Sequence, residues 1–442
     1  MRTRLVVLVV VLFFGAAPSW AGTVPDNRPL PGYTVNNPPL PPEVIDGKPT
    51  RVLQGIHRHA AYTIEVPAKW NGRLAMWAHG YRGTGTVLTV DPPNFGLRRQ
   101  MLNDGYAWAA SSYYANGYDV RAGVTTTHDL AQRFAQLVAR PKQVLIAGVS
   151  MGGHIIGRSL EQYPGFYDGA LPMCGVLGDQ ELFDFFTSYQ LTAQTLAGID
   201  AYPLPPDYLT TVVPRIQDTL GLTHLVPGGP DTVTPNGAQF RAVVTNLSGG
   251  PRPGATPAFA FWKDFLFNLG TPVPEGAPLS LDPGRVATNL FTRYQPNSPV
   301  DLNRKVRRIA PRDWFSRLTP TLTEVPRIAG RPTAPVLSLH GLGDLFVPFA
   351  MEQEYRNDVA RNGRTKSLVQ RAIRTVNHCE FSPVEAGTAW HDLVGWVDHG
   401  TRPAGDVVND PAQVASPTYG CRFTDATAYN SPGTRKLFAP CP

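Results

Sequence analysis

"QVLIAGVSMGGHIIG", residues 143–157, is a run of strand-forming residues that stops at a glycine, presents one serine and continues with small and apolar residues. This change of pattern predicts a buried strand, a tight turn and then a helix. Ser150 falls at the start of that helix, where free N–H groups and the helix dipole favour negative charge. Ser150 is therefore either a nucleophile or a small residue that the turn requires.

Residues 148–152 match the pattern G-x-S-x-G. The bare pattern is weak evidence, but its position between a strand and a helix is typical of a nucleophile elbow, which exposes a serine hydroxyl on a sharp turn. Small residues are needed on either side because the turn is tight and the helix packs close to the strand. We therefore interpret Ser150 as a nucleophile, with a purely structural serine as the alternative.

Strand-like and helix-like segments alternate around this stretch. The amphipathic segment 125–141 precedes it, and the apolar segment 169–175 follows it. The alternation stops after Gly178 and returns at residues 334–344. Near-continuous apolar strands at this spacing are typical of a parallel sheet covered on both faces. The sequence thus predicts an α/β fold with a mostly parallel sheet, helices on both faces and a large helical cap inserted between the late strands.

These patterns divide the chain into five parts. They are a signal peptide at 1–21, a proline-rich arm at 22–51, an α/β core at 52–178 and 330–400, a helical cap at 179–329, and a C-terminal tail at 401–442. Within the core, Asn71-Gly72 is a turn signal that predicts a hairpin joining strands at 60–67 and 73–80. Within the cap, helices are predicted at 179–198, 205–221, 257–270 and 286–294.

The N-terminal segment has the features of an export signal. Arg2 and Arg4 precede an apolar run over residues 5–14, and small residues follow, with cleavage expected near Ala21. The run is too short to span a bilayer, so we expect a secreted or periplasmic protein. An uncleaved membrane anchor is the alternative.

The composition is that of a folded protein and excludes several function classes. Of the 442 residues, 42% are hydrophobic and 17% are charged, which predicts a large core and argues against disorder. The net charge is +6, and the densest basic cluster, residues 304–312, suggests a solvated helix face rather than a nucleic-acid site. No phosphate-binding or dinucleotide-binding motif is found, so no cofactor is expected. His57-Arg58-His59 lacks an accompanying carboxylate or cysteine cluster, which favours a surface strand over a metal site.

The four cysteines predict two disulfides, because an even number in an exported chain usually means pairs. Cys421 and Cys441 flank a segment that resembles a hairpin turning at residues 431–433, so we pair them as a clip on the tail. By elimination, Cys174 pairs with Cys379. Two free buried thiols are the alternative for the second pair.

A serine hydroxyl needs a base that takes its proton and an acid that orients the base. His378 follows the last predicted strand, at the sheet edge where Ser150 also emerges. Asp344 follows the next-to-last strand, which gives the chain order serine, acid, histidine. Asp179, after the preceding strand, is the alternative acid.

Acyl transfer also needs donors to the developing oxyanion. The segment "MWAHGYRGTG" supplies a strand that ends in His79-Gly80, so that the backbone N–H of Tyr81 is directed at the elbow. The N–H of Met151, the residue after the nucleophile, is its expected partner. The alternative is a glycine-rich loop without a catalytic role.

Together, these features resemble the α/β-hydrolase superfamily over residues 52–178 and 330–400. The segments 340–348 and 377–403 resemble the closing segments of exported bacterial esterases and prolyl-oligopeptidase-like hydrolases. The dipeptide His378-Cys379 is similar to that of tannases and feruloyl esterases, in which this cysteine is bridged to one directly before the nucleophile. The present chain has Val149 at that position, although Cys174 is available to bridge Cys379 to the neighbouring strand.

The cap is rich in large apolar residues, of which most should form the core of the cap and some should line a pocket over Ser150. They are Phe183, Phe185, Phe186, Tyr189, Phe259, Phe261, Trp262, Phe265, Phe267 and Phe291. No cluster of acidic residues that would capture a peptide amine is evident, which favours a neutral ester. The sequence thus predicts an exported serine esterase acting on a small or polymeric ester. A serine peptidase or aminopeptidase is the first alternative, and an inactive binding protein on the same fold is the second.

Overall fold

The computed structural model describes residues 25–269, 285–295, 301–430 and 433–441. The predicted signal peptide and two residues of the predicted tail turn, Ser431 and Pro432, lie outside these ranges. Within them, no helix is both long and apolar enough to cross a membrane.

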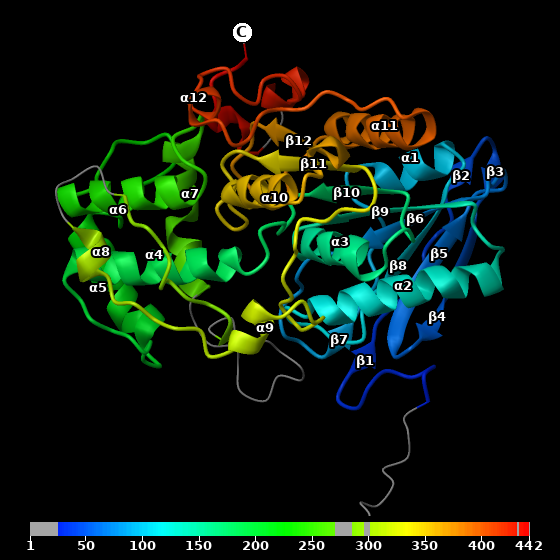
Figure 1. Cartoon of the computed structure of the whole chain (residues 1–442), viewed down its shortest axis with the longest axis horizontal. Coiled ribbons are helices and arrows are strands. Elements are labelled where there is room, and N and C mark those ends of the chain that lie inside the picture. The colour runs from blue at the N-terminus through cyan, green and yellow to red at the C-terminus, as the bar shows by residue number, and fades with distance from the viewer. Residues whose placement is uncertain (1–24, 270–284, 296–300, 431–432, 442) are drawn as a thin grey trace, which may run out of the picture.

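An eight-stranded sheet forms the centre of the molecule (Figure 1). From one edge to the other, the strands run in the order β4-β5-β8-β6-β9-β10-β11-β12. Only β5 runs against both of its neighbours, whereas all strands from β8 to β12 in this order are parallel. The bounds are β4 Arg51–His57, β5 Ala60–Val66, β6 Arg73–Ala78, β8 Ala107–Ser111, β9 Gln143–Val149, β10 Gly169–Met173, β11 Val336–Gly341 and β12 Leu368–Ile373.

Helices cover both faces of this sheet (Figure 1). They are α1 Leu97–Asn103, α2 Val120–Leu137, α3 Met151–Gln162, α10 Ala350–Arg361 and α11 Pro383–His399. Buried side chains of α1 and α11 pack on the sheet face that carries Trp77, whereas those of α2, α3 and α10 pack on the face that carries Met76. Counted along the chain, the eight strands have the spatial order 1-2-4-3-5-6-7-8 with the second antiparallel. This is the α/β-hydrolase fold, and the predicted fold class is confirmed.

Two short two-stranded sheets lie outside the central sheet. In the first, β1 (Thr34–Val35) pairs with β7 (Val87–Leu88), and in the second, β2 (Val44–Ile45) pairs with β3 (Lys48–Pro49). Strand pairing thus joins the proline-rich arm to a later segment through β1 and β7, whereas β2 and β3 form a hairpin within the arm itself.

The predicted hairpin between residues 60–67 and 73–80 is wrong. β5 and β6 are not neighbours, because β8 lies between them. The Asn71 side chain instead donates to the carbonyl oxygen of Asp104 at 2.8 Å, so the turn signal marks a loop that packs beside the end of α1. The true hairpin joins β4 to β5, and Arg58 and His59 form its turn with positive φ angles.

The cap contains its own group of helices, seen on the left of Figure 1. They are α4 Glu181–Ala197, the π-helical turn η1 Tyr208–Val212, α5 Val213–Leu220, α6 Pro235–Leu247, α7 Ala255–Asn268, α8 Leu302–Lys305 and α9 Trp314–Leu318. The prediction missed α6, and the predicted helix at 286–294 is wrong, because Asn289 and Thr288 bind the backbone of residues 307 and 309 instead. The basic cluster 304–312 is helical only up to Lys305.

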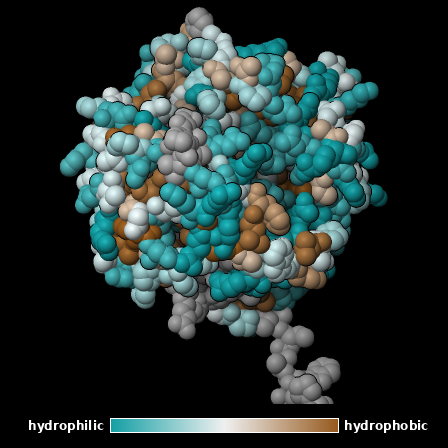
Figure 2. All heavy atoms as spheres, turned by 60° about the vertical axis from the view of Figure 1, so that its left-hand side comes forward, coloured by the Kyte–Doolittle hydropathy of each residue, from teal (hydrophilic) through white to brown (hydrophobic). Residues whose placement is uncertain are grey.

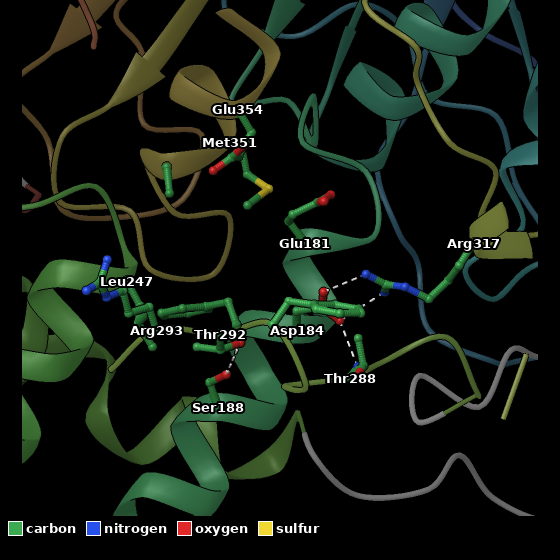
Figure 3. Close-up of a pocket in the computed structure, with 13 residues that line it drawn as sticks. Glu181, Asp184, Ser188, Leu247, Thr288, Thr292, Arg293, Arg317, Met351 and Glu354 are labelled. Carbon is green, nitrogen blue, oxygen red and sulfur yellow. Dashed lines mark hydrogen bonds and ion pairs between the residues drawn. The ribbon is translucent and has the colours of Figure 1, made fainter. Parts of the chain in front are cut away.

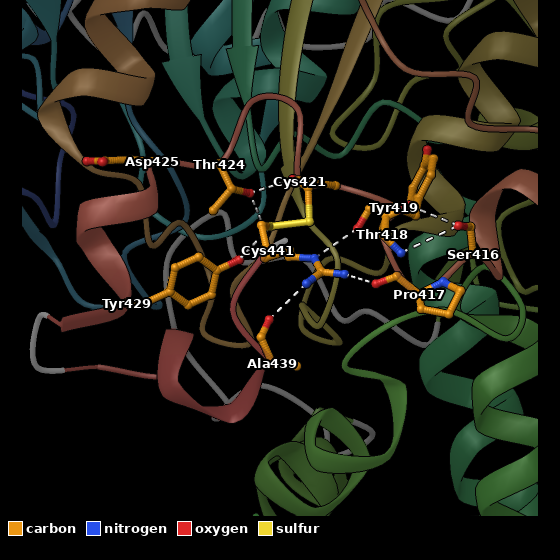
Figure 4. The surroundings of a disulfide bond; sticks show 12 residues. Ser416, Pro417, Thr418, Tyr419, Cys421, Thr424, Asp425, Tyr429, Ala439 and Cys441 are labelled. Atoms are coloured by element: carbon orange, nitrogen blue, oxygen red, sulfur yellow. Dashed lines mark hydrogen bonds between the residues drawn. A yellow bond between two sulfur atoms is a disulfide. The ribbon is translucent and has the colours of Figure 1, made fainter.

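The tail folds over the end of β12 as short helical turns rather than as the predicted hairpin. These are α12 Pro411–Val414, η4 Ala426–Asn430 and η5 Arg435–Leu437, and a further turn, η3 Thr365–Ser367, precedes β12. Figure 4 shows the disulfide between Cys421 and Cys441 that closes the tail. The buried side chain of Arg374 donates to the carbonyl oxygens of Tyr419 and Ala439 and thus ties the tail to the end of β12.

The surface on the cap side is mainly hydrophilic with separate apolar spots (Figure 2). Three large apolar side chains on this side are strongly exposed, namely Phe291, Leu318 and Phe315, with 80%, 71% and 59% of their surface accessible. All three belong to the cap, so the apolar residues of this segment do not all serve its core.

Candidate active site

Ser150 occupies a strained turn between β9 and α3. Its φ of 57° and ψ of −122° are unfavourable for a residue with a side chain, and such strain is typical of functional turns. The helix starts at the next residue, so the N–H of Met151 has no acceptor within its own helix. The turn therefore places a serine hydroxyl next to free backbone donors at the carboxyl edge of the sheet.

Glycines make this turn sterically possible. A Cβ atom on Gly148 or on Gly152 would overlap the carbonyl oxygen of Ala78 at the end of β6. A Cβ on Gly153 would overlap the backbone of Gly175 in the same way. The G-x-S-x-G pattern thus follows from the close packing of α3 against the ends of the two neighbouring strands.

The His79-Gly80 loop lies directly beside Ser150. A Cβ on Gly80 would stand 3.0 Å from Cβ and 3.5 Å from Oγ of Ser150. The ring of His79 is buried, stacks on Tyr113 at 3.8 Å between centroids, and has its Nδ1 2.7 Å from the carbonyl oxygen of Gly80. Burial, together with the positive charge of Arg82, lowers the pKa of His79 to about 3. A neutral ring therefore fixes the peptide group that carries the Tyr81 N–H.

Asp344 and His378 meet across the ends of β11 and β12. Nδ1 of His378 lies 2.6 Å from Oδ2 of Asp344. The other carboxylate oxygen accepts the backbone N–H groups of Phe346 and Val347 at 2.9 and 3.0 Å. Asp344 is fully buried, so these three bonds satisfy a charge that water does not reach.

A disulfide joins the residue after His378 to the end of β10. Cys379 is bonded to Cys174 across a sequence separation of 205 residues. β12 lies three strand positions from β9, which is about 14 Å at the usual spacing, so the histidine loop has to cross two strand ends to approach Ser150. The bridge holds the loop over β10, next to the strand that carries Ser150. Its sulfur atoms lie within 4.8 Å of a His378 ring nitrogen, but oxidised sulfurs are not thiolate ligands for a metal.

Among the described residues, the structure gives no hydrogen bond between Ser150 and His378. Nε2 of His378 lies 3.3 Å from Sγ of Cys379 instead. The structure therefore brings Asp344 and His378 into contact and leaves Ser150 at the end of β9, two strand positions from β11. Hydrogen bonds between nucleophile and base are often long in hydrolases without substrate and tighten when substrate binds.

An aromatic cluster lies against the imidazole. The ring of Phe346 is 4.9 Å from that of His378, between centroids, and it contacts Phe265 of α7 at 5.0 Å. Trp262 and Phe186 reach the same ring at 6.3 and 6.4 Å. Phe265 keeps 39% of its surface accessible, so the cluster presents an apolar side beside the predicted base.

A polar cavity of about 320 Å³ lies between α4, the segment 288–293 and the start of α10 (Figure 3). It is lined by three carboxylates, Glu181, Asp184 and Glu354, which the sequence analysis did not bring together. Burial raises the pKa of each, that of Asp184 to about 6 although Arg317 donates to both of its oxygens. Neither Ser150 nor the Asp344–His378 pair lines this cavity.

The alternative acid, Asp179, is used elsewhere. Its Oδ2 accepts the N–H of Ile328 at 2.7 Å, and its Oδ1 accepts that of Gln180. No bond from Asp179 to His378 is present in the described ranges. The carboxylate fixes the start of α4 against the end of the cap, which is a structural role.

Sequence reasoning missed the side chains that hold the histidine loop from outside. Oγ1 of Thr434 accepts the N–H groups of Val376 and Asn377, both at 2.9 Å. The Nε1 of Trp262 donates to the carbonyl oxygen of Val376 at 2.8 Å. Trp262 is one of the apolar cap residues expected in the cap core or the pocket, but no local pattern predicts its bond to Val376, and none marks Thr434, because both contacts join residues far apart in sequence.

The chain is similar to known proteins at low sequence identity. No protein-family model matches the chain. The chain is similar to an o-phthalyl amidase of Xanthobacter agilis, with 20% identity over 87% of this chain and 99% of the amidase. It is also similar to a solved esterase from Aspergillus oryzae, with a TM-score of 0.47 and 16% identity over 80% of this chain and 81% of that one. Feruloyl esterase B from the same organism gives a TM-score of 0.42 and 14% identity over 80% and 82% of the chains.

Proposed function

We propose that the protein is an exported serine hydrolase that cleaves carboxylic esters through an acyl-enzyme on Ser150. The observation that carries the proposal is the strained turn of Ser150 at the sheet edge that also bears the Asp344–His378 pair. A buried carboxylate bound to an imidazole, at the same sheet edge as a serine held at a helix start, is what acyl transfer needs.

The chemistry assigns one role to each group. Oγ of Ser150 attacks the ester carbonyl carbon while Nε2 of His378 takes the hydroxyl proton, and Asp344 holds Nδ1–H and stabilises the imidazolium. The N–H groups of Tyr81 and Met151 donate to the oxyanion. The imidazolium then protonates the leaving alcohol, and a water molecule, deprotonated by the same nitrogen, hydrolyses the acyl-enzyme.

One feature supports a substrate ester with an apolar part, and another supports export of the chain. The aromatic cluster around Phe346 offers an apolar side next to the base, as substrate pockets commonly do. The two disulfides fit an oxidising compartment and the predicted signal peptide.

An amide substrate is the second candidate. It is favoured by the likeness to an amidase that extends over 87% of this chain. The catalytic groups are the same for both substrates. The substrates differ in the leaving group, since an amine departs less readily than an alcohol and depends more strongly on protonation by the imidazolium. A matched ester and anilide of one acyl group, compared by kcat/KM, separates the two candidates.

The first test replaces the nucleophile. We expect Ser150→Ala to lower turnover of p-nitrophenyl acetate at least about 10³-fold, while circular dichroism shows an unchanged fold. Ser159→Ala is the matched control, because Ser159 is a buried serine further along α3, beside Tyr167 and away from the turn of Ser150. It should retain full turnover.

Labelling by a fluorophosphonate probe separates an enzyme from an inactive binding protein. We expect the native protein to be labelled and Ser150→Ala to remain unlabelled. Retained turnover by Ser150→Ala would overturn the assignment, and an unlabelled, inactive native protein would favour the binding function.

A further inference from the structure

Trp262 of the cap contacts two catalytic loops with one N–H group. Its Nε1 lies 2.8 Å from the carbonyl oxygen of Val376 and 3.1 Å from that of Gly343. Val376 stands two residues before His378, and the carbonyl of Gly343 belongs to the same peptide group as the N–H of Asp344. A single donor is therefore shared between the loop of the predicted acid and the loop of the predicted base.

The two loops are also paired with each other beneath this donor. The N–H of Leu342 donates to the carbonyl oxygen of Ile373, and that of Gly343 to the carbonyl oxygen of Thr375, both at 2.8 Å. These bonds continue the pairing of β11 with β12 past the strand ends. Beyond these two bonds, Nε1 of Trp262 donates to one carbonyl oxygen of each loop.

The indole is itself held firmly in the cap. Its ring is buried, with 6% of its surface accessible, and it makes edge contacts with Phe261 and Phe265 at 5.1 and 5.4 Å between centroids. The ring also lies 6.3 Å from Phe346, the side chain that contacts His378. The donor therefore moves only if α7 moves.

A second cap side chain acts at the same place. Nε of the buried Arg252 donates to the carbonyl oxygen of Leu342 at 2.6 Å. The rest of the guanidinium is fixed within the cap, on the carbonyl oxygen of Gly250 and on Oγ of Ser248. The residues from 342 to 344 are thus held by the cap at two successive carbonyl groups.

We propose that Trp262 is a positioning residue that couples the cap to the Asp344–His378 pair, a role that rests on the proposed serine-hydrolase function. The shared N–H sets the relative position of the acid loop and the histidine loop, and Arg252 supports the acid loop. The cap is accordingly part of the catalytic unit, and displacement of α7 separates the acid from the base.

The test replaces Trp262 by phenylalanine, which lacks the indole N–H and keeps an aromatic ring. Trp262→Phe should lower kcat for p-nitrophenyl acetate roughly tenfold or more, with KM changed by less than about threefold, because misplacement of the base slows the chemical step. Trp70→Phe is the matched control, because Trp70 Nε1 also donates to a backbone carbonyl oxygen, that of Arg73 at 2.7 Å, at the opposite end of β6. The control should lose stability with kcat unchanged.

Hydrogen exchange separates failure of this proposal from failure of the proposed function. In Trp262→Phe, amide exchange should become faster at residues 342–347 and 375–380 together, and not in α3. Unchanged kcat and unchanged exchange in both loops would overturn the coupling. Faster exchange in both loops of a protein without any esterase or amidase activity would retain the coupling and reject the hydrolase function.

A second variant guards against loss of folding. If Trp262→Phe does not fold, Arg252→Lys removes the Nε contact with Leu342 and keeps the charge. It should accelerate exchange at residues 342–344 and lower kcat severalfold. Native exchange and native kcat in this variant would reject the support of the acid loop by the cap.

Discussion

The turn that carries Ser150 and the loop that carries His378 lie at the same edge of the sheet, but different forces hold them. The turn is fixed by close backbone packing, since a Cβ on Gly148 in β9 or on Gly152 in α3 would overlap the carbonyl oxygen of Ala78 at the end of β6. The loop is fixed by side chains from distant segments, namely a disulfide to Cys174, the indole of Trp262 and the hydroxyl of Thr434. The proposed nucleophile thus depends on local backbone packing, and the proposed base depends on cross-links that come from three parts of the chain.

The largest effect is expected from adding a Cβ atom at Gly152, beneath the turn. Gly152→Ala should lower turnover about 100-fold or more and the free energy of unfolding by about 3 kcal/mol, because its Cβ would overlap a backbone oxygen that cannot move away cheaply. Gly387→Ala is the control, because a Cβ there meets nothing within 4 Å. Assays of turnover and urea unfolding measure both, and equal behaviour of the two variants would contradict a packing-limited turn.

Removal of the bridge to Cys174 should have the next largest effect. Replacing Cys174 and Cys379 by serine should lower the free energy of unfolding by about 2–4 kcal/mol and reduce kcat, because the histidine loop is no longer held over β10. Replacing Cys421 and Cys441 opens a loop of 20 residues instead of 205, so the loss of stability should be smaller. Thermal unfolding and kcat of both double variants test this order, and a larger loss for the second pair would contradict it.

His79, in the loop beside the turn of Ser150, should make the fold less stable at low pH. Because the pKa of His79 is lowered from 6.5 to about 3, its contribution to stability is present above pH 6.5 and is lost as the pH falls toward 3. Lowering the pH from 7 to 5 should therefore lower the free energy of unfolding by about 2 kcal/mol through His79 alone. Urea unfolding of the native protein and of His79→Asn at both pH values measures the difference, and an equal loss in both proteins would exclude His79 as the source.

The smallest effect is expected from removing the contact between Thr434, in the tail, and the histidine loop. Thr434→Val removes the acceptor of the Val376 and Asn377 N–H groups and should lower the free energy of unfolding by about 1–2 kcal/mol, with a moderate fall in kcat. Thr434→Ser keeps the hydroxyl and should behave like the native protein. If the serine variant is as impaired as the valine variant, the hydroxyl is not what holds the loop.

The same contrast explains what the sequence analysis could predict. Alternating strands and helices, the G-x-S-x-G turn and the position of His378 after a strand are local patterns, so the fold class and the contact of Asp344 with His378 were accessible from the chain. The hairpin at Asn71-Gly72 was predicted wrongly because a turn signal does not reveal that β8 inserts between the two strands. The roles of Trp262 and Thr434 depend on contacts over 114 and 58 residues, which no periodicity encodes.

The position of Thr434 along the chain determines when its contact with the histidine loop can form. Synthesis proceeds from the N-terminus, and domains fold as their residues emerge. The strand, turn and glycines around Ser150 emerge almost 300 residues before Thr434 does. A nascent chain therefore carries Ser150 long before it carries the Thr434 hydroxyl that holds the loop of His378, so this loop gains its last support only when synthesis has passed the tail.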